Sequence, residues 1–322
     1  MQEAVETIYF GGGTPSLLEI EEVRQQIDVI KKNFKVNKNV EITLEANPDD
    51  INSEKLAGWK KAGINRLSIG VQSFFEEDLA WMNRAHNAQQ AIDNLQMALE
   101  QFDNITVDLI YGHPLLTDEK WKKNVEKVIS LNIRHLSCYA LTVEPKTPLH
   151  KMIKEHKKED VNPDIQSEQF LLLMHWLEEA GYEHYEISNF CKPGFRSRHN
   201  SSYWKIEKYL GIGPSAHSFN GSSRQWNVSN NHAYIDSIKK GRVPFEMEIL
   251  TPVQQLNEYI MTSLRTMEGL DLEKIDYEYR EKLNASSNKF IDGGLMRKKQ
   301  NQLILTREGK LLADGIAAAL FV

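Results

Sequence analysis

The stretch from Glu6 to Ser16, ETIYFGGGTPS, joins a short apolar run to three consecutive glycines. The run is rich in β-branched and aromatic residues, which is typical of a strand, and the glycines end it. Ser16 followed by Glu19 matches a capping box, so the sequence predicts a helix from Ser16 to about Asn33. A strand that leads directly into a helix is the repeating unit of a parallel sheet.

The same unit recurs along the first two-thirds of the chain. Further strands are predicted at VEITLEAN (40–47), RLSIGVQ (66–72), NITVDLIYG (104–112), HLSCYAL (135–141) and YEHYEISNF (182–190). Helices are predicted at 53–62, with Gly63 as a left-handed cap, and at 76–82, 88–102, 118–131 and 166–180. Six strands with right-handed crossovers predict an α/β fold, an open and partial (β/α)6 barrel, because a closed barrel of this type needs eight.

The sequence changes in character after about residue 245. Helices are predicted at 251–269 and 275–283, followed by a β-hairpin and a helix that begins near Thr306. This pattern predicts a barrel domain of residues 1–245 and a small winged-helix-like domain of residues 246–322. Charges of both signs are mixed on the predicted helices, which favours a packing role for this domain over DNA binding.

The composition narrows the classes of function. Lys and Arg total 39 against 45 Asp and Glu, a net charge of -6, which gives no general attraction to nucleic acid or to an anionic membrane. No apolar run approaches the roughly 20 residues that cross a bilayer. The N-terminus has no basic stretch before an apolar segment. We therefore expect a cytoplasmic protein with no transmembrane segment and no nucleic-acid partner.

Polar residues gather where the predicted parallel strands end, which is the working edge of a barrel. The glycine run lets the backbone approach a ligand closely, although a tight turn explains it as well. Glu45 alone is equally explained as a solvated carboxylate, and Arg84 as a surface partner for an acid such as Asp78. Gln72 and Asp108 interrupt apolar strands, where an uncompensated polar group is costly, so they imply a ligand or a dedicated partner.

Four motifs follow one another in order: YFGGGTPS (9–16), EITLEANPDD (41–50), RLSIGVQSF (66–74) and VDLIYGHP (107–114). The series resembles the radical S-adenosylmethionine enzymes of the coproporphyrinogen oxidase type, over nearly the whole chain. By that resemblance, S-adenosylmethionine is held by Gly12, Gly13, Thr14, Glu45, Gln72, Arg84 and Asp108, with Ala140 and His217 nearby. The residue types agree, because a guanidinium suits the methionine carboxylate and carboxylates suit ribose hydroxyls or the amino group.

The segment from His199 to Trp204, HNSSYW, matches the HNxxYW pattern of the heme chaperone branch of that family. A neutral imidazole of His199 can ligate heme iron, and Tyr203 and Trp204 can flank a porphyrin plane. A turn cap and two core aromatics explain the same residues without a ligand. The resemblance favours a heme-binding protein that delivers heme to an acceptor protein. The alternative is an oxygen-independent oxidase that converts coproporphyrinogen III to protoporphyrinogen IX.

The family places a CxxxCxxC loop after its first strand, and the three thiolates hold a [4Fe–4S] cluster. Here the two cysteines are Cys138 and Cys191, far apart in sequence; we expect a core thiol and a partly exposed thiol beside a turn. Either the sequence begins late, at about the family's second strand, or the protein has lost the cluster and kept a binding function. We expect the late start, so that only a full-length form carries the cluster. The residues present then support no radical chemistry, and we predict no catalytic or metal-ligating residue among them. The sheet edge left by a missing strand predicts pairing with another chain or reduced stability.

Two readings from outside the family stay open at this point. The GGGTP turn is also suited to a phosphate cradle in an ordinary barrel enzyme or sugar-phosphate binder, which leaves HNxxYW unexplained. A winged-helix regulator would show salt-sensitive DNA binding.

Overall fold

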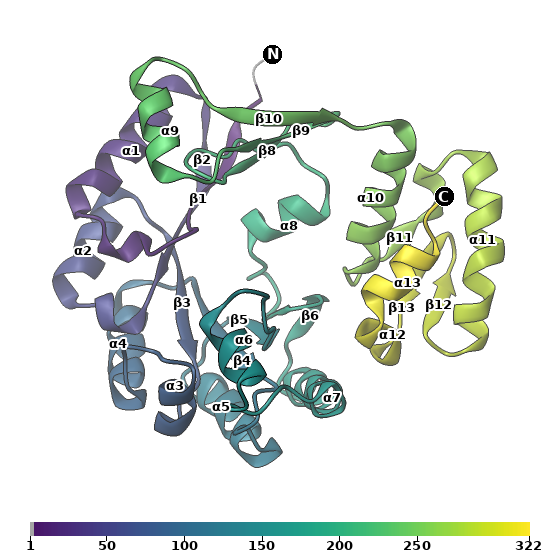
Figure 1. Cartoon of the computed structure of the whole chain (residues 1–322), viewed down its shortest axis with the longest axis horizontal. Coiled ribbons are helices and arrows are strands. Elements are labelled where there is room, and N and C mark those ends of the chain that lie inside the picture. Colours follow the sequence, from purple (N-terminus) through teal and green to yellow (C-terminus); the bar gives the residue numbers. More distant parts are fainter. Residues whose placement is uncertain (1–2) are drawn as a thin grey trace. The chain divides into compact units, whose positions relative to one another are not determined.

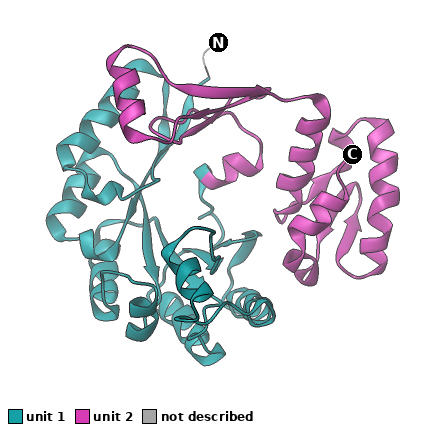
Figure 2. Cartoon of the chain, in the orientation of Figure 1, with its two compact units in different colours: residues 1–199 teal, residues 200–322 magenta. Residues whose placement is uncertain are grey.

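The computed structural model describes residues 3–322, and the chain forms two compact units, residues 1–199 and 200–322 (Figure 2). The division falls within a single helix, α8 (Arg198–Trp204). The domain boundary that the sequence predicts at residue 245 lies inside the second unit and stays a prediction.

The first unit is built around one curled sheet in the strand order β1-β2-β3-β4-β5-β7-β6 (Figure 1). Strands β1 to β5 pair in parallel, as the repeated strand and helix pattern predicts. The α/β half-barrel expected from the sequence is therefore confirmed. The strands are β1 (Val5–Phe10), β2 (Val36–Ala46), β3 (Arg66–Gln72), β4 (Ile105–Tyr111), β5 (His135–Ala140), β6 (Glu183–Glu186) and β7 (Asn189–Cys191).

The last predicted strand, 182–190, is a hairpin rather than one strand. β7 runs antiparallel to both β5 and β6 and lies between them. The turn contains neither glycine nor proline; instead the Glu186 carboxylate accepts the backbone N–H of Ser188, at 3.2 Å, and the side-chain amide of Asn189. Only Ile187 and Ser188 separate the two strands, and without a glycine or proline the stretch resembles one continuous strand, which is why the sequence pattern missed the turn.

Helices cover one face of this sheet, as Figure 1 shows. Their bounds are α1 (Ile20–Asn33), α2 (Ser53–Ala62), α3 (Glu76–Trp81), α4 (Ala88–Gln101), α5 (Asp118–Ser130), α6 (Pro148–Lys154) and α7 (Pro163–Glu179), with short 3-10 turns at Pro15–Leu17 and Pro48–Asp50. Gly63 ends α2 with a φ of 111°, the left-handed cap that the sequence predicts.

The predicted start of α1 at Ser16 is wrong. The helix begins at Ile20, and Glu19 with Glu22 forms the capping box. Ser16 lies in the preceding 3-10 turn, where its hydroxyl donates to Asp50 at 2.6 Å. A capping motif of the right spacing therefore occurs twice within seven residues, and the second one begins the helix.

The strands of the first unit alternate between apolar and polar side chains. One side, the apolar face, faces the helices: it includes Ile8, Phe10, Ile42, Leu44, Leu67, Ile69, Val107, Leu109, Leu136 and Cys138, all buried. The other side, the polar face, carries the residues between them: Thr7, Tyr9, Glu41, Thr43, Glu45, Arg66, Ser68, Thr106, Asp108, His135 and Ser137. Strands of a parallel sheet that is covered by apolar material on both sides would read as continuous apolar runs, so this alternation marks a face of different use.

The second unit contains two three-stranded sheets. The first has the order β10-β9-β8, with β8 (His217–Phe219), β9 (Ser223–Asn227) and β10 (Phe245–Ile249), and is accompanied by α9 (Asn231–Lys239). The second has the order β11-β13-β12, with β11 (Leu270–Asp271), β12 (Met296–Lys299) and β13 (Gln302–Leu305). Its helices are α10 (Pro252–Leu264), α11 (Tyr277–Asp292), α12 (Arg307–Leu311) and α13 (Ala313–Ala319), and the winged-helix-like domain of residues 246–322 stays a prediction. Within residues 3–322 no helix is both long and apolar enough to span a membrane.

Candidate ligand site on the polar face

The glycine turn follows β1 at the carboxyl end of the sheet. Gly12 has a φ of 79°, a conformation that favours glycine, and its N–H donates to the Glu45 carboxylate at 3.3 Å. A Cβ atom added to Gly12 or Gly13 would meet nothing within 4 Å, so the space above the turn is open. Thr14 is exposed at the start of the following 3-10 turn. The turn therefore offers open main chain beside a carboxylate.

Glu45 is held in place by a residue that the sequence argument did not single out. The hydroxyl of Tyr9 donates to Glu45 at 2.7 Å. Burial raises the pKa of Tyr9 above its usual range, and the neighbouring Glu45 charge raises it further, so the hydroxyl remains a donor. Glu45 is thus not freely solvated, and it forms no ion pair with any of residues 3–322.

Gln72 and Arg84 meet at Gly70. A Cβ on Gly70 would lie 2.8 Å from the Gln72 amide nitrogen and 3.5 Å from the Arg84 guanidinium, so both side chains pass over this glycine. Arg84 donates to the Asn47 side chain at 2.8 Å and to the Gly70 carbonyl at 3.3 Å, and not to the suggested partner Asp78. Gln72 adopts a φ of 67°, which is unusual for a residue with a side chain and is often found at ligand sites.

Asp108 lies on the polar face beside Glu45. Ser68 is the register partner of Glu45 and donates to Asp108 at 3.3 Å, so one serine lies between the two carboxylates. Burial raises the pKa of Asp108 to about 7, and the charge of Glu45 contributes in the same direction. A carboxyl poised near neutrality responds readily to a cationic ligand.

The last two predicted cofactor residues are placed differently. Ala140 ends β5, in the register of Leu136 and Cys138, so its methyl group lies on the side of the apolar face. His217 is exposed on β8 in the second unit, where its ring lies 6.4 Å from that of Trp226. The first unit therefore brings together Gly12, Glu45 and Asp108 in one group and Gln72 and Arg84 in a neighbouring one.

His199 opens helix α8 and lies against β1. Its Nδ1 hydrogen-bonds the Thr7 hydroxyl at 2.9 Å, and its ring stacks on Tyr9 with centroids 4.6 Å apart and planes 15° apart. The backbone N–H groups of Arg198 and His199 donate to Glu41 at 3.2 and 3.0 Å. Burial, with a smaller effect from Arg66, lowers the pKa of His199 to about 4. The imidazole is therefore neutral at pH 7.

Tyr203 and Trp204 belong to the second unit. The Tyr203 ring packs edge-on against Tyr209, with centroids 4.8 Å apart, and 39% of the residue is exposed. Trp204 is partly buried, with the Arg265 guanidinium 5.4 Å from its ring. Its indole nitrogen has no hydrogen-bond partner among residues 3–322. These residues are not closed in a fully packed core, so the explanation by core aromatics does not account for Tyr203.

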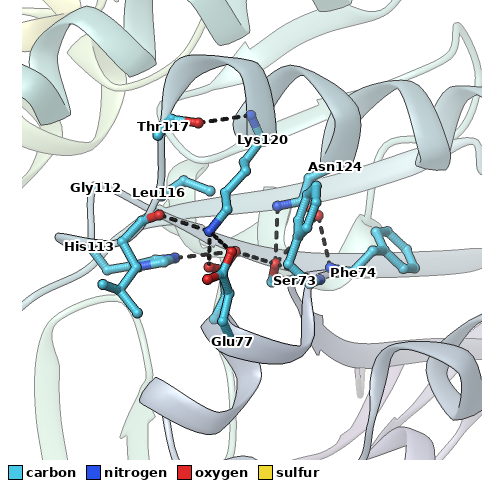
Figure 3. A network of polar contacts seen from close by, with 12 residues as sticks. Ser73, Phe74, Glu77, Gly112, His113, Leu116, Thr117, Lys120 and Asn124 are labelled. Atoms are coloured by element: carbon cyan, nitrogen blue, oxygen red, sulfur yellow. Dashed lines mark hydrogen bonds and ion pairs between the residues drawn. The ribbon is translucent and has the colours of Figure 1, made fainter.

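A buried polar network fixes the loop that follows Gln72 (Figure 3). Ser73 donates to Asp78 at 2.8 Å, and the Asn124 side chain accepts the Phe74 N–H at 2.8 Å. Lys120 of α5 donates to Asp78 at 3.2 Å, which gives this fully buried carboxylate a cation from another helix. Sequence reasoning missed the network because its members lie in the loop after β3, on α3 and on α5, and share no local pattern.

The cysteines do not fit a four-iron cluster. Cys138 is buried on the apolar face, as predicted, and Cys191 is buried as well, so its expected partial exposure is wrong. Burial raises the pKa of both thiols, Cys191 to about 12, which disfavours the thiolate that iron requires. Among residues 3–322 no group of three His, Cys, Asp or Glu side chains could hold a metal ion.

Comparison with known proteins identifies the family. Residues 1–128 match the family model described as the radical SAM superfamily. The chain is 33% identical over 325 residues to the heme chaperone HemW of Bacillus subtilis (strain 168), covering 99% of this chain and 86% of that protein. It is 32% identical over 318 residues to HemW of Mycobacterium tuberculosis (strain ATCC 25618 / H37Rv), covering 98% and 80%. The chain belongs to the HemW family.

A solved structure supports the fold of this HemW family member. Coproporphyrinogen III oxidase (HemN) from Escherichia coli superposes with a TM-score of 0.84 and 23% identity, covering 99% of this chain and 78% of that one. At that identity the likeness concerns the fold. The residues on the polar face are of types that suit S-adenosylmethionine. There is open space at Gly12 and Gly13, and the carboxylates of Glu45 and Asp108 and the guanidinium of Arg84 lie on this face.

Proposed function

We propose that this chain binds heme and passes it to an acceptor protein. The observation that carries the proposal is the neutral imidazole of His199, held by Thr7 and Glu41 within the HNxxYW segment. A neutral imidazole is the form that ligates iron. The relatives at 31–33% identity bear the name heme chaperone, which agrees with this use of the histidine.

The surroundings of His199 suit an iron ligand. Thr7 hydrogen-bonds Nδ1, and a partner on one ring nitrogen fixes the tautomer and orientation of a ligating imidazole. Tyr203 and Trp204 follow His199 on α8 and are proposed to flank the porphyrin plane. Heme is the cargo in this proposal, and its acceptor is a protein of the cytoplasm, where we place the chain.

We assign S-adenosylmethionine to the strand ends of the polar face. Arg84 would hold the methionine carboxylate, and Glu45 or Asp108 the ribose hydroxyls or the amino group. Gly12 and Gly13 leave room for the ligand, Thr14 follows them, and Gln72 lies beside Arg84. The family resemblance adds Ala140 and His217 to the assigned set. In radical S-adenosylmethionine proteins the bound cofactor supplies a radical when a reduced cluster cleaves it.

Oxidation of coproporphyrinogen III is the alternative activity. It requires the cluster, which the residues present do not fit. Anaerobic reconstitution of this polypeptide with iron and sulfide should therefore give no four-iron signal. A strong signal would return the oxidase to consideration.

Heme titration tests the proposed function directly. The Soret band should shift and saturate for the wild-type chain and for His232→Ala, a control at an exposed histidine on α9. His199→Ala should weaken binding at least about tenfold, since an iron ligand is lost. Heme on the wild-type chain should then move to added apomyoglobin. An unchanged Soret band in the wild type, or equal affinity in His199→Ala, would contradict the proposal.

A further inference from the structure

Tyr9 touches both proposed ligand sites in the first unit. Its hydroxyl donates to Glu45 at 2.7 Å, and Glu45 also accepts the Gly12 N–H. Its ring stacks on His199 at 4.6 Å, nearly parallel. One side chain therefore joins the glycine turn assigned to S-adenosylmethionine to the imidazole assigned to heme.

The packing around Tyr9 leaves little freedom. A Cβ atom on Gly11 would lie 2.6 Å from the Tyr9 ring and 2.8 Å from the Glu45 carboxylate, both closer than real contacts allow. Gly11, Tyr9 and Glu45 are thus in mutual contact. A change in the position of the Glu45 carboxylate must be followed by the Tyr9 ring.

Two further residues of the first unit, Thr7 and Glu41, hold His199. Thr7, two residues before Tyr9 on the same face of β1, hydrogen-bonds the ring nitrogen. Glu41, the register partner of Thr7 on β2, accepts the His199 N–H. Among these three contacts Tyr9 alone also touches Glu45. A change in the position of Glu45 beside the glycine turn therefore reaches the imidazole through Tyr9.

We infer that Tyr9 is a positioning residue that couples the two ligands, so that S-adenosylmethionine weakens the binding of heme. This inference rests on the proposed function. When a bound ligand donates hydrogen bonds to Glu45, Glu45 releases the Tyr9 hydroxyl. The Tyr9 ring is then free to move and no longer holds His199 in place by stacking. Coupling between two binding sites is reciprocal, so heme weakens S-adenosylmethionine binding by the same factor.

The test compares heme affinity with and without saturating S-adenosylmethionine, by Soret titration. In the wild type the cofactor should raise the heme dissociation constant about fivefold or more, the lower end of typical coupling. Tyr9→Phe keeps the ring and removes the hydroxyl. It should bind heme as the cofactor-loaded wild type does and show no response to the cofactor. Tyr277→Phe, at a residue 74% exposed in the second unit, is the control and should keep the wild-type response.

Each outcome decides the inference separately from the proposed function. Heme binding that the cofactor does not weaken in the wild type, or a response retained by Tyr9→Phe, overturns the coupling and leaves heme binding intact. If the wild type binds no heme, the proposed function fails. The His199 ring signals, observed by ¹H–¹⁵N NMR during cofactor titration, then decide the coupling: they should shift in the wild type and not in Tyr9→Phe. Absence of a shift in the wild type, or the same shift in both, contradicts it.

Discussion

Thr43 and Leu44 are neighbours on β2, and they point to opposite faces of the same sheet. Leu44 is fully buried on the apolar face against the helices. Thr43 is equally buried on the polar face, where its hydroxyl has no hydrogen-bond partner among residues 3–322. Packing explains the first residue and does not explain the second. A buried hydroxyl without a partner costs stability that packing does not explain, which agrees with the ligand role that we propose for the polar face.

Substitution of these two neighbours should give the largest difference in stability between the two faces. Leu44→Ala should lower the free energy of unfolding by about 2–5 kcal/mol, through lost burial and a cavity. Thr43→Val should change it by less than about 1 kcal/mol or raise it, because a buried hydroxyl without a partner is removed. Urea unfolding followed by circular dichroism measures both. Equal losses would mean that the polar face is also a packed core.

The network in Figure 3 is the exception in which polar residues stabilise the fold. Asn124→Ala should cost about 1–3 kcal/mol, because the Phe74 N–H and the Ser73 hydroxyl lose a buried partner. Ser130→Ala, at an exposed helix end, should change stability by less than about 0.5 kcal/mol. Thermal unfolding compares the two variants. If Asn124→Ala left the stability unchanged, the network would not be what holds the loop after Gln72.

Arg84 tests whether the polar face binds S-adenosylmethionine. Arg84→Ala should weaken S-adenosylmethionine binding roughly 10- to 100-fold, the range of one charge-assisted contact. Arg84→Lys should recover part of the loss, since it keeps the charge without the two-pronged geometry. Arg24→Ala, at an exposed arginine paired with Glu21, is the matched control. If calorimetry gave the same affinity for all three variants, the carboxylate would bind elsewhere.

Asp108 predicts an effect on stability that depends on pH. Its pKa is raised to about 7 in the folded chain, against about 4 in an unfolded chain. Between these values the folded state holds a proton that the unfolded state has released, so stability falls as pH rises from about 4 to 7. Asp108→Asn should flatten this part of the profile, and Asp103→Asn, at an exposed residue, should not. Parallel profiles for wild type and Asp108→Asn would contradict the raised pKa.

The sequence predicts most of the fold, and it predicts the candidate site residues but not their partners. Local signals sufficed for the five parallel strands, for the Gly63 cap and for the polar residues at strand ends. The hairpin after residue 182 was missed because its two-residue turn, Ile187 and Ser188, contains neither glycine nor proline. The capping motif at Ser16 misled because a second motif follows at Glu19.

The partners of the site residues could not be predicted. Tyr9 and His199 are 190 residues apart in sequence, and only the folded chain stacks their rings. Tyr9 itself looked like an ordinary strand aromatic. The alternation of polar residues along β1, β2 and β3 was the available signal, because it departs from the apolar runs expected of a parallel sheet.

The axial ligand of bound heme tests the central claim, that the polar face of this sheet is a ligand face, most directly. Electron paramagnetic resonance and magnetic circular dichroism of the heme-loaded chain identify that ligand. We predict imidazole ligation in the wild type and in His232→Ala, and its loss in His199→Ala. The same imidazole signature in His199→Ala would contradict the claim and move heme away from this face.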